Sequence, residues 1–286
     1  MVSEMSRSES TAGATDSSSR PATARLPLSA VIIAKNEADR IGRCLNSLAA
    51  VCDEVLVLDS GSTDRTVAIA LAAGARVEVQ EWLGFAAQKN AAISLARNDW
   101  VLLLDADEWL GEGASLRLAQ LFAGGRVEQA DVWRLERRTH YMGKALRFGG
   151  WGREAVERLF RKRYRYQPAS VHERLDLAGA RIAVCPARIE HDTARTEAEY
   201  RNKLAGYARL FAQQRHAQGK RASLAAPATH ALFYALKNGL LRGGFLDGPQ
   251  GWRYHLAHTH YVWQKYRILR SLAHGATGSE LPRGHD

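Results

Sequence analysis

Three short apolar runs and one further short strand segment alternate with helical patterns in the first part of the chain. The apolar runs cover residues 28–33, 54–58 and 100–104, and each is typical of a buried strand; the further strand is predicted over residues 76–79. The segments between them predict helices over residues 41–48, 66–73 and 85–96. Strands alternating with helices of this length predict a parallel sheet covered by helices on both faces.

The pattern changes after residue 130. Short runs rich in arginine predict strands over residues 131–137, 156–161 and 181–184, with a glycine-rich loop at 149–152. From Thr196 the chain reads as helical, because Thr196 and Glu199 form a capping box. Two more helices are predicted over residues 224–241 and 249–274. The expected fold class is α/β, a mostly parallel sheet with flanking helices and a C-terminal helical extension.

Polar clusters follow three of the predicted strands. Asp105-Ala106-Asp107-Glu108, Asp59-Ser60-Gly61-Ser62-Thr63-Asp64 and Ala34-Lys35-Asn36-Glu37 each come directly after an apolar run. The carboxyl ends of parallel strands meet at one edge, where such sheets bind ligands. Asp105 and Asp107 are one residue apart and point the same way on extended backbone, which suits a hard divalent cation and a phosphate-bearing substrate. The alternative is an acidic loop that begins the next helix, expected over 111–122.

Charge and composition limit the class of protein and the kind of partner. The 286 residues carry a formal charge of +10, with 40 basic and 30 acidic side chains, which implies an anionic partner. Three cysteines without metal-ligand spacing suggest a reducing compartment. Residues 1–26 are expected to form a disordered leader rather than a signal peptide. No run of 18 apolar residues occurs, so we expect no spanning helix.

Taken in order, these motifs resemble family 2 glycosyltransferases of the GT-A, Rossmann-like fold. The ordered set is the three clusters above together with Gln88-Lys89-Asn90. Two later pieces, Val171-His172-Glu173 and Gly244-Phe245-Leu246-Asp247-Gly248, resemble the lipopolysaccharide core β-1,4-glucosyltransferase branch of that family. The resemblance implies a catalytic domain over residues 27–195, with a nucleotide-sugar half at 27–125 and an acceptor half at 126–195. Residues 196–286 would form a helical, membrane-surface region.

The resemblance also implies the reaction and its partners. It implies inverting transfer of a hexose, glucose by preference, from a UDP-sugar to a lipopolysaccharide inner-core or other lipid-linked glycan acceptor. Mg²⁺ or Mn²⁺ would be the cofactor, and the enzyme would be cytoplasmic, peripheral on the inner membrane at an anionic surface. No nucleic-acid partner is expected.

Roles carry over by motif position. Ala34, Asn36, Glu37, Asp59, Lys89, Asp105 and Ala106 would bind the nucleotide sugar. Lys89 stands where Arg is common in related sequences, so a planar bidentate donor is replaced by a point charge. Asp107, with Asp105, would ligate the metal. His191 is not part of a carried-over motif; its place in a polar turn after a strand fits a further metal ligand, a phosphate donor or a structural histidine.

The base for the acceptor hydroxyl should be a carboxylate or imidazole from the later half of the domain. We expect Glu173, flanked by His172 and Arg174, with Glu108 and Asp192 as reserves. The alternative for Glu173 is a surface ion pair with Arg174.

Three further features have two readings each. Trp151 and its neighbouring glycines fit a mobile lid or a connecting loop. A basic region fits an acceptor surface or a solvated strand face; it comprises Lys144, Arg147, Arg153, Arg158, Arg161, Lys162, Arg163 and Arg165. The last helix fits an interfacial helix or one packed on the catalytic domain; its aromatic residues are Trp252, Tyr254, Tyr261, Trp263 and Tyr266.

Other classes remain open. The charge and the sequence pI near 9.8 would suit a nucleic-acid-binding protein, but the chain lacks a zinc finger or a clear recognition helix. A nucleotidyltransferase would carry a glycine-rich triphosphate loop after the first strand, where this chain has Ala34-Lys35-Asn36-Glu37. The intact acidic set argues against a non-catalytic relative.

Overall fold

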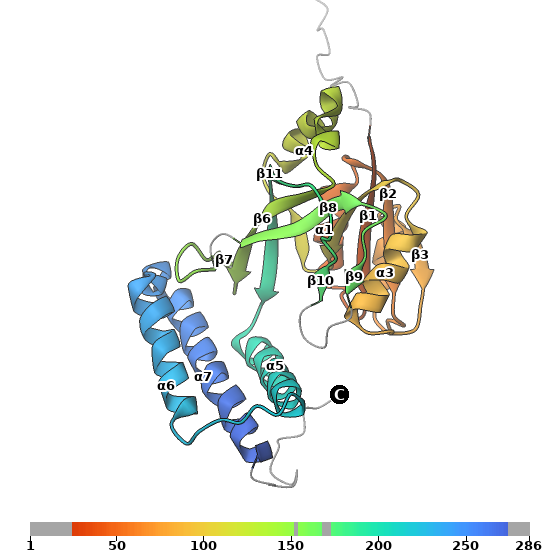
Figure 1. Ribbon diagram of the computed structural model, residues 1–286. Coiled ribbons are helices and arrows are strands. Elements are labelled where there is room, and N and C mark those ends of the chain that lie inside the picture. The colour runs from red at the N-terminus through yellow and green to blue at the C-terminus, as the bar shows by residue number, and fades with distance from the viewer. Residues whose placement is uncertain (1–24, 152–153, 168–172, 274–286) are drawn as a thin grey trace, which may run out of the picture.

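A computed structural model describes residues 25–151, 154–167 and 173–273. One large mixed sheet runs through the molecule, with its strands in the order β3-β2-β1-β4-β8-β6-β11-β5 and β7 paired to β6. The first four strands are mutually parallel. Their bounds are β1 Leu26–Ala34, β2 Cys52–Asp59, β3 Arg76–Val79 and β4 Trp100–Asp105. The predicted α/β class is confirmed (Figure 1).

The second half of the sheet mixes directions. β4 pairs antiparallel with β8, β8 antiparallel with β6, and β6 parallel with β11. The bounds are β5 Glu108–Leu110, β6 Val132–Tyr141, β7 Lys144–Ala145, β8 Glu154–Arg161 and β11 Ile182–Ala194. A separate two-stranded sheet joins β9 Tyr166–Gln167 to β10 Arg174–Leu175.

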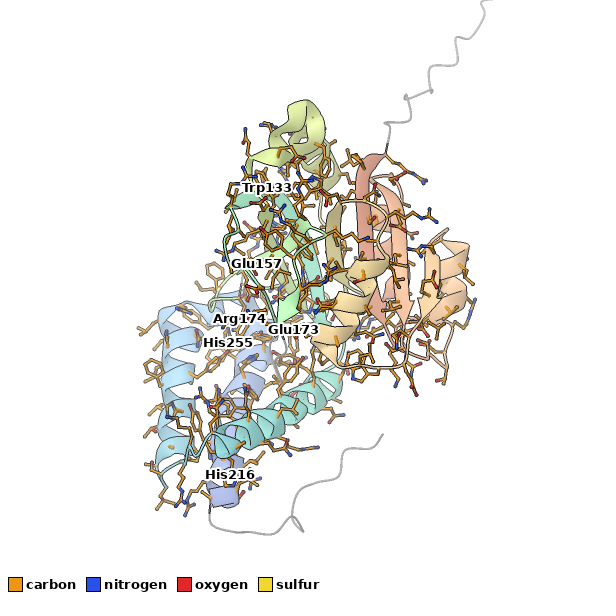
Figure 2. The ribbon with its side chains drawn as sticks, turned by 45° about the vertical axis from the view of Figure 1, so that its right-hand side comes forward. Trp133, Glu157, Glu173, Arg174, His216 and His255 are labelled. Carbon is orange, nitrogen blue, oxygen red and sulfur yellow. The ribbon has the colours of Figure 1, made fainter. Side chains whose placement is uncertain are left out.

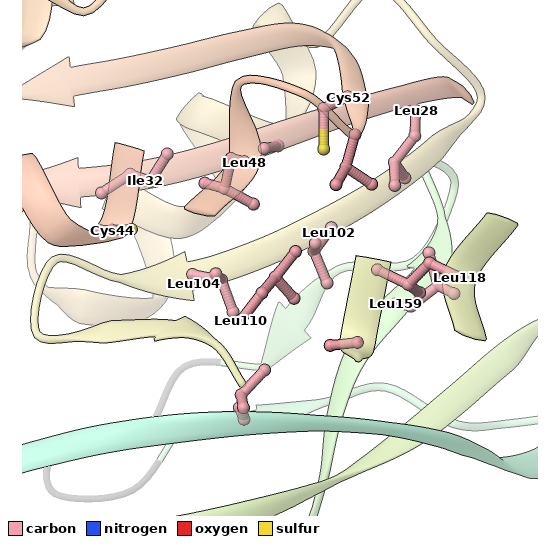
Figure 3. Close-up of a cluster of buried hydrophobic side chains, with 14 of the residues drawn as sticks. Leu28, Ile32, Cys44, Leu48, Cys52, Leu102, Leu104, Leu110, Leu118 and Leu159 are labelled. Atoms are coloured by element: carbon pink, nitrogen blue, oxygen red, sulfur yellow. The ribbon is translucent and has the colours of Figure 1, made fainter. Parts of the chain in front are cut away.

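Apolar side chains fill both faces of the sheet. On β4, Leu102 and Leu104 enter one buried cluster and Val101 and Leu103 enter another. Burial on both faces explains why the strand reads as a continuous apolar run instead of an alternation. The first cluster packs under α1 Ile41–Leu48, α2 Thr66–Ala72 and α4 Ala114–Phe122. Figure 3 shows part of this cluster, with Leu48 of α1 and Leu118 of α4. The second lies under α3 Phe85–Leu95. A 3₁₀ segment, η1 Ala123–Gln129, follows α4.

Helices at the other end of the sheet from α4 make up the C-terminal extension (Figure 1). They are α5 Glu197–Ala217, α6 Ala226–Tyr234 with its π-helical continuation η2 Ala235–Leu241, η3 Gly244–Asp247 and α7 Gly248–Ala273. One of the two bonds of the capping box expected at Thr196 is present, because Thr196 Oγ1 accepts from Glu199 N at 3.1 Å. The Glu199 side chain accepts from Arg195 N at 3.0 Å, where the capping box would have Thr196 N as the donor. In the part of the chain that is described, no helix is long and apolar enough to cross a membrane.

Several boundaries differ from the sequence prediction. The strand expected over residues 181–184 runs from Ile182 to Ala194, because its polar positions are satisfied by pairing with β6 and β5. Glu108, expected in a loop, begins β5, and the helix expected from residue 111 begins at Ala114. β1 begins at Leu26, the last residue of the predicted leader; residues 1–24 lie outside the described part.

One carboxylate joins the helical extension to the sheet. Asp247 is buried, and its side chain accepts backbone N–H groups from Arg147 and Phe148 at 3.0–3.1 Å. Lys144 Nζ donates to the Asp247 carbonyl at 2.6 Å. The loop after β7 and the segment before α7 are therefore fixed to each other.

Candidate active site

The loops after β1, β2 and β4 meet at one edge of the sheet, as the strand register requires. Asp59 lies opposite Ala34 on one side of β1, and Asp105 lies opposite Ile33 on the other. The three polar clusters of the sequence are thus brought to the carboxyl end of neighbouring parallel strands. This is the position at which open α/β sheets bind ligands.

Asp59 and Asn36 shape this edge. Asp59 is buried, and its carboxylate accepts from Gly61 N at 2.9 Å and from both Ser62 N and Ser62 Oγ, at 2.8 and 2.5 Å. Asn36 has a positive φ of 55° and accepts from Thr63 N through Oδ1 at 2.8 Å. These bonds tie the loop after β1 to the loop after β2. Nucleoside contact by Asp59 and Asn36 stays a prediction.

A cavity of about 810 Å³ lies between this edge and the C-terminal helices. Its size is in the upper part of the about 300–1,000 Å³ range of small-molecule sites. Eight of the predicted site residues line it: Ala34, Glu37, Lys89, Asp105, Ala106, Asp107, Glu173 and His191. Asn36 and Asp59 are not among its lining residues, and His172 lies outside the described residues. Glu157 and Glu173 lie between the sheet and the helices in Figure 2.

Asp105 is held between two cations. Its Oδ2 accepts from Arg158 Nη2 at 2.7 Å, and Lys89 Nζ lies 3.3 Å from its Oδ1. Burial opposes ionisation of Asp105, but these cations outweigh it and hold its pKa below the usual value. Both oxygens of Asp105 are thus engaged by cations within the protein, and metal ligation by Asp105 and Asp107 stays a prediction.

Lys89 links Asp105 to the predicted base. Lys89 Nζ donates to Glu173 Oε1 at 2.5 Å, so Glu173 pairs with Lys89 instead of with its sequence neighbour Arg174. Burial of Lys89 favours its neutral form, yet the carboxylates of Asp105 and Glu173 raise its pKa above the ordinary value. Sequence reasoning did not foresee this pair, because its members are 84 positions apart.

Arg158 and Glu108 form a buried support beneath the acidic loop. Glu108 is fully buried, accepts from Arg158 Nη2 at 2.7 Å and accepts from Asp105 N at 3.1 Å. Glu108 therefore positions the loop and is not among the cavity-lining residues, which removes it as a reserve base. Arg158 was expected either on an acceptor surface or on a solvated strand face; instead it is buried against these two acids.

Much of that predicted basic region is engaged within the protein. Arg161 pairs with Asp99 and Glu128, and Arg163 pairs with Asp131 at 2.8 Å. Both arginines thus form ion pairs within the protein. We therefore interpret the predicted basic region as mainly structural and not as an acceptor surface. Arg153 lies outside the described residues.

The side chains of Asp107 and His191 lie next to each other in the lining of the cavity. Asp107 Oδ2 lies 3.4 Å from His191 Nε2 and 4.0 Å from Lys203 Nζ. Burial opposes ionisation of Asp107, but His191 and then Lys203 outweigh it and lower its pKa. His191 Nδ1 is buried without a hydrogen-bond partner among the described residues. His191 comes from β11, whose register opposite Glu108 of β5 explains the approach.

The residues present fit a divalent ion only in part. No three His, Cys, Asp or Glu side chains gather as a preformed metal site within the described residues. Two ligands about 2.1 Å from one ion lie about 3 Å apart at right angles, and Asp107 and His191 are close to that separation. Mg²⁺ commonly takes one or two protein ligands and completes its shell with water and substrate phosphates. The pair therefore fits an ion that arrives with a diphosphate.

Aromatic side chains line the opposite end of the cavity. Trp151, Tyr207, Tyr254, His258 and Tyr261 all contribute, from the loop before β8 and from α5 and α7. Tyr254 is only 2% exposed, so its predicted place on an interfacial surface is wrong. Trp151 packs on His258 with ring centroids 4.9 Å apart, and a lid role for its loop stays a prediction.

Comparison with known proteins places the chain. The sequence profile of Glycosyl transferase family 2 matches residues 29–173. An uncharacterized glycosyltransferase of Rickettsia typhi is 31% identical over 236 residues, covering 78% of this chain and 80% of the relative. This chain belongs to family 2 of the glycosyltransferases and is thus an enzyme of that class.

More specific likenesses cover less of the chain. The lipopolysaccharide core biosynthesis glycosyltransferase LpsC of Rhizobium meliloti is 34% identical over 158 residues, 54% of this chain and 50% of the relative. The chain spans only 37–39% of the length of other curated relatives, uncharacterized glycosyltransferases of Rickettsia. Glucosyl-3-phosphoglycerate synthase of Mycobacterium tuberculosis, solved with Mn²⁺ and UDP, is 26% identical over 40% of this chain and 43% of that chain, with a TM-score of 0.31.

Proposed function

We propose that the protein is an inverting glycosyltransferase that transfers a hexose, glucose by preference, from a UDP-sugar to a lipopolysaccharide inner-core or other lipid-linked glycan. The observation that carries this is one cavity in a family 2 chain, lined by Asp105, Asp107, Lys89 and His191 at the carboxyl edge of the sheet. The likeness to LpsC supports the choice of acceptor. The enzyme would act in the cytoplasm, peripheral on the inner membrane.

The donor would occupy the sheet end of the cavity. There Ala34 ends β1, Lys35 and Glu37 follow it, and Ala106 follows β4. In this proposal the nucleoside lies along these loops. Asn36 and Asp59 hold the loops in their conformation and also contact the nucleoside. Residues 27–125 would then form the donor half, and residues 126–195 the acceptor half.

Asp107 and His191 would hold Mg²⁺ or Mn²⁺ against the diphosphate. When bound, the ion would neutralise charge that develops on the leaving group. Lys203, whose Nζ lies 4.0 Å from Asp107 Oδ2, adds a further positive charge on the same side. Arg158 and Glu108 keep the acidic loop in place, so that Asp107 does not have to be ordered when substrate arrives.

The acceptor would enter from the aromatic end of the cavity. Tyr207, Tyr261 and Trp151 offer flat apolar faces beside the charged Lys203, a combination suited to a sugar ring bearing anionic groups. Glu173 is proposed as the base, with His172 beside it in sequence. Because Glu173 is paired with Lys89 in the free protein, binding of the donor diphosphate near Lys89 would release the carboxylate for proton transfer.

The test is release of UDP from a panel of UDP-sugars, with Mg²⁺ or Mn²⁺, by the purified full chain. We expect turnover with one preferred sugar and loss of at least about a hundredfold in Asp107→Asn, because charge on the diphosphate is then poorly compensated. Asp53→Asn is the matched control, since Asp53 lies at the opposite end of β2. A mass increase of one hexose on core lipopolysaccharide identifies the acceptor.

A second readout separates metal binding from activity. Titration of Mn²⁺ followed by electron paramagnetic resonance, with UDP present, should show one bound ion in the native chain and in Asp53→Asn, and loss of it in Asp107→Asn. Full activity and full Mn²⁺ binding in Asp107→Asn would refute the metal role. Absence of UDP release with every sugar would refute the proposed reaction.

A further inference from the structure

A row of large apolar side chains lies on the outer side of the C-terminal helices. Leu232, Phe233, Leu236 and Leu240 are all exposed, Leu232 at 60% and Phe233 at 62%. Helical spacing puts the four on one side of α6 and η2, and the buried Ala231 lies on the other side. α6 packs against α7, which in turn packs against α5, so α6 is the outermost of the three helices (Figure 1).

The row continues onto the neighbouring segments. Five further exposed apolar residues follow in η2, η3 and the first turns of α7: Leu241, Phe245, Leu246, Trp252 and Leu256. The rings of Phe245 and Trp252 lie 6.5 Å apart, which joins η3 to α7. We call these nine side chains the docking face. Contiguous exposed apolar surface of this kind marks an interaction site.

Positive charge surrounds the docking face. Residues 196–273 contain twelve Lys or Arg and three Asp or Glu, so this region carries nearly all of the chain's formal charge of +10. One of the three acids, Asp247, is buried and bonded to backbone N–H groups. Lys237 Nζ lies 5.4 Å from the ring centroid of Phe233, and Arg242 and Arg253 are exposed next to the apolar residues.

We propose that the docking face binds the surface of an anionic phospholipid bilayer. Its aliphatic and aromatic side chains enter the boundary between headgroups and acyl chains, and Lys237, Arg242 and Arg253 pair with lipid phosphates. A second copy of the chain is the other occupant to consider. Two such faces would bring like charges together, which disfavours a symmetric contact between copies.

This surface differs from the one that the sequence indicated. The aromatic residues expected to lie in the interface, Tyr254 and Tyr261, face the cavity instead. Trp252 and Leu256 lie on the outer side of the same helix. Bilayer contact and the aromatic cavity wall therefore share α7, which places a lipid-linked acceptor near the cavity. That last step rests on the proposed function, whereas binding to lipid does not.

The experiment is co-sedimentation of the full chain with vesicles, without sugar donor. Vesicles of phosphatidylglycerol with phosphatidylethanolamine should bind the native chain, and vesicles of phosphatidylcholine should bind it weakly. We expect Leu236→Ser with Leu240→Ser to lower the partition coefficient about tenfold or more, because two inserted leucines are removed. Leu71→Ser with Leu116→Ser is the matched control, since these leucines are exposed to a similar extent, 58% and 63%, on α2 and α4.

Charge is tested separately by Lys237→Glu with Arg253→Glu, which should weaken binding to the anionic vesicles, as should added salt. Equal vesicle binding by the Leu236 and Leu240 variant and the native chain would overturn the proposal. So would a dimer in light scattering that this variant abolishes while vesicle binding persists. UDP release in the absence of lipid should stay unchanged in all these variants. A chain that binds vesicles but turns over no UDP-sugar would refute the proposed function and leave this inference standing.

Discussion

His258 should make the stability of the protein depend on pH. It is 7% exposed, its Nδ1 is hydrogen-bonded to Tyr200 OH at 2.8 Å, and its ring packs against Trp151 and Tyr254. Burial, followed by the nearby His255 and Lys265, lowers the pKa of His258 to about 3. The folded protein therefore holds this imidazole neutral over a range in which the unfolded chain protonates it.

The sign and size of the effect follow from linkage. Above about pH 6.5 both states are neutral at this position, so His258 contributes no pH dependence. Below that value the unfolded state binds one more proton than the folded state, and stability falls by about 1.4 kcal/mol per pH unit until the folded pKa is reached. Between about pH 7.5 and about pH 5 the expected loss is about 2 kcal/mol.

The assay is urea denaturation at these two pH values for the native chain and for His258→Asn. Asparagine offers an oxygen near the position of Nδ1 and does not titrate. Between the two pH values the variant should therefore lose about 2 kcal/mol less of its free energy of unfolding than the native chain. Burial also lowers the pKa of His255, and comparing the two chains subtracts that contribution. Equal losses in both chains would refute the reasoning, as would an NMR titration of His258 with a midpoint near pH 6.5.

Two further predictions concern the cavity and its support. Glu173→Gln should keep the affinity for UDP, measured by calorimetry, while UDP-sugar turnover falls by about a hundredfold or more, because no carboxylate is left to accept the proton; unchanged turnover would move the base elsewhere. Gly149→Ala should lower the free energy of unfolding in urea by about 2–4 kcal/mol, because φ is +73° and the new Cβ would meet His255 Nε2 at 2.2 Å. Gly74→Ala is its control, since φ is +77° there and no atom lies within 4 Å; it should cost only about 1 kcal/mol. Equal losses at the two glycines would count against the close contact with His255.

The parallel half of the fold could be predicted because local patterns decide it. Three of its strands, β1, β2 and β4, are apolar runs closed by a polar turn, as with β4 and Asp105. The later half resisted prediction, because Arg188 and Glu190 of β11 pair with Glu136 and Arg138 of β6, a strand about fifty positions away in the chain. Thus Glu190 lies beside Arg138 and Trp109 in neighbouring strands, and no periodicity within residues 182–194 reports those partners.

The site was predicted in part for the same reason. Motif order brought Asp105, Asp107 and Lys89 together, since short-range turns fix where each lies at the sheet edge. The pairs Lys89–Glu173 and Arg158–Glu108 join residues 84 and 50 positions apart, and the sequence offered only local alternatives for them. Accordingly, the sequence offered only Arg174 as an ion-pair partner for the predicted base Glu173, and both interpretations of Arg158 placed it on a surface.

The Asp247 contacts limit how this enzyme could be recombined with its relatives. A chimera that replaced the helices after residue 196 would also have to import the loop at residues 144–149, because backbone amides of that loop end on the Asp247 carboxylate. Replacing the helices alone would remove the carboxylate that accepts these N–H groups. A chimera that keeps these hydrogen bonds must therefore take both segments, the loop and the helices with Asp247, from the same parent, although they are about a hundred positions apart.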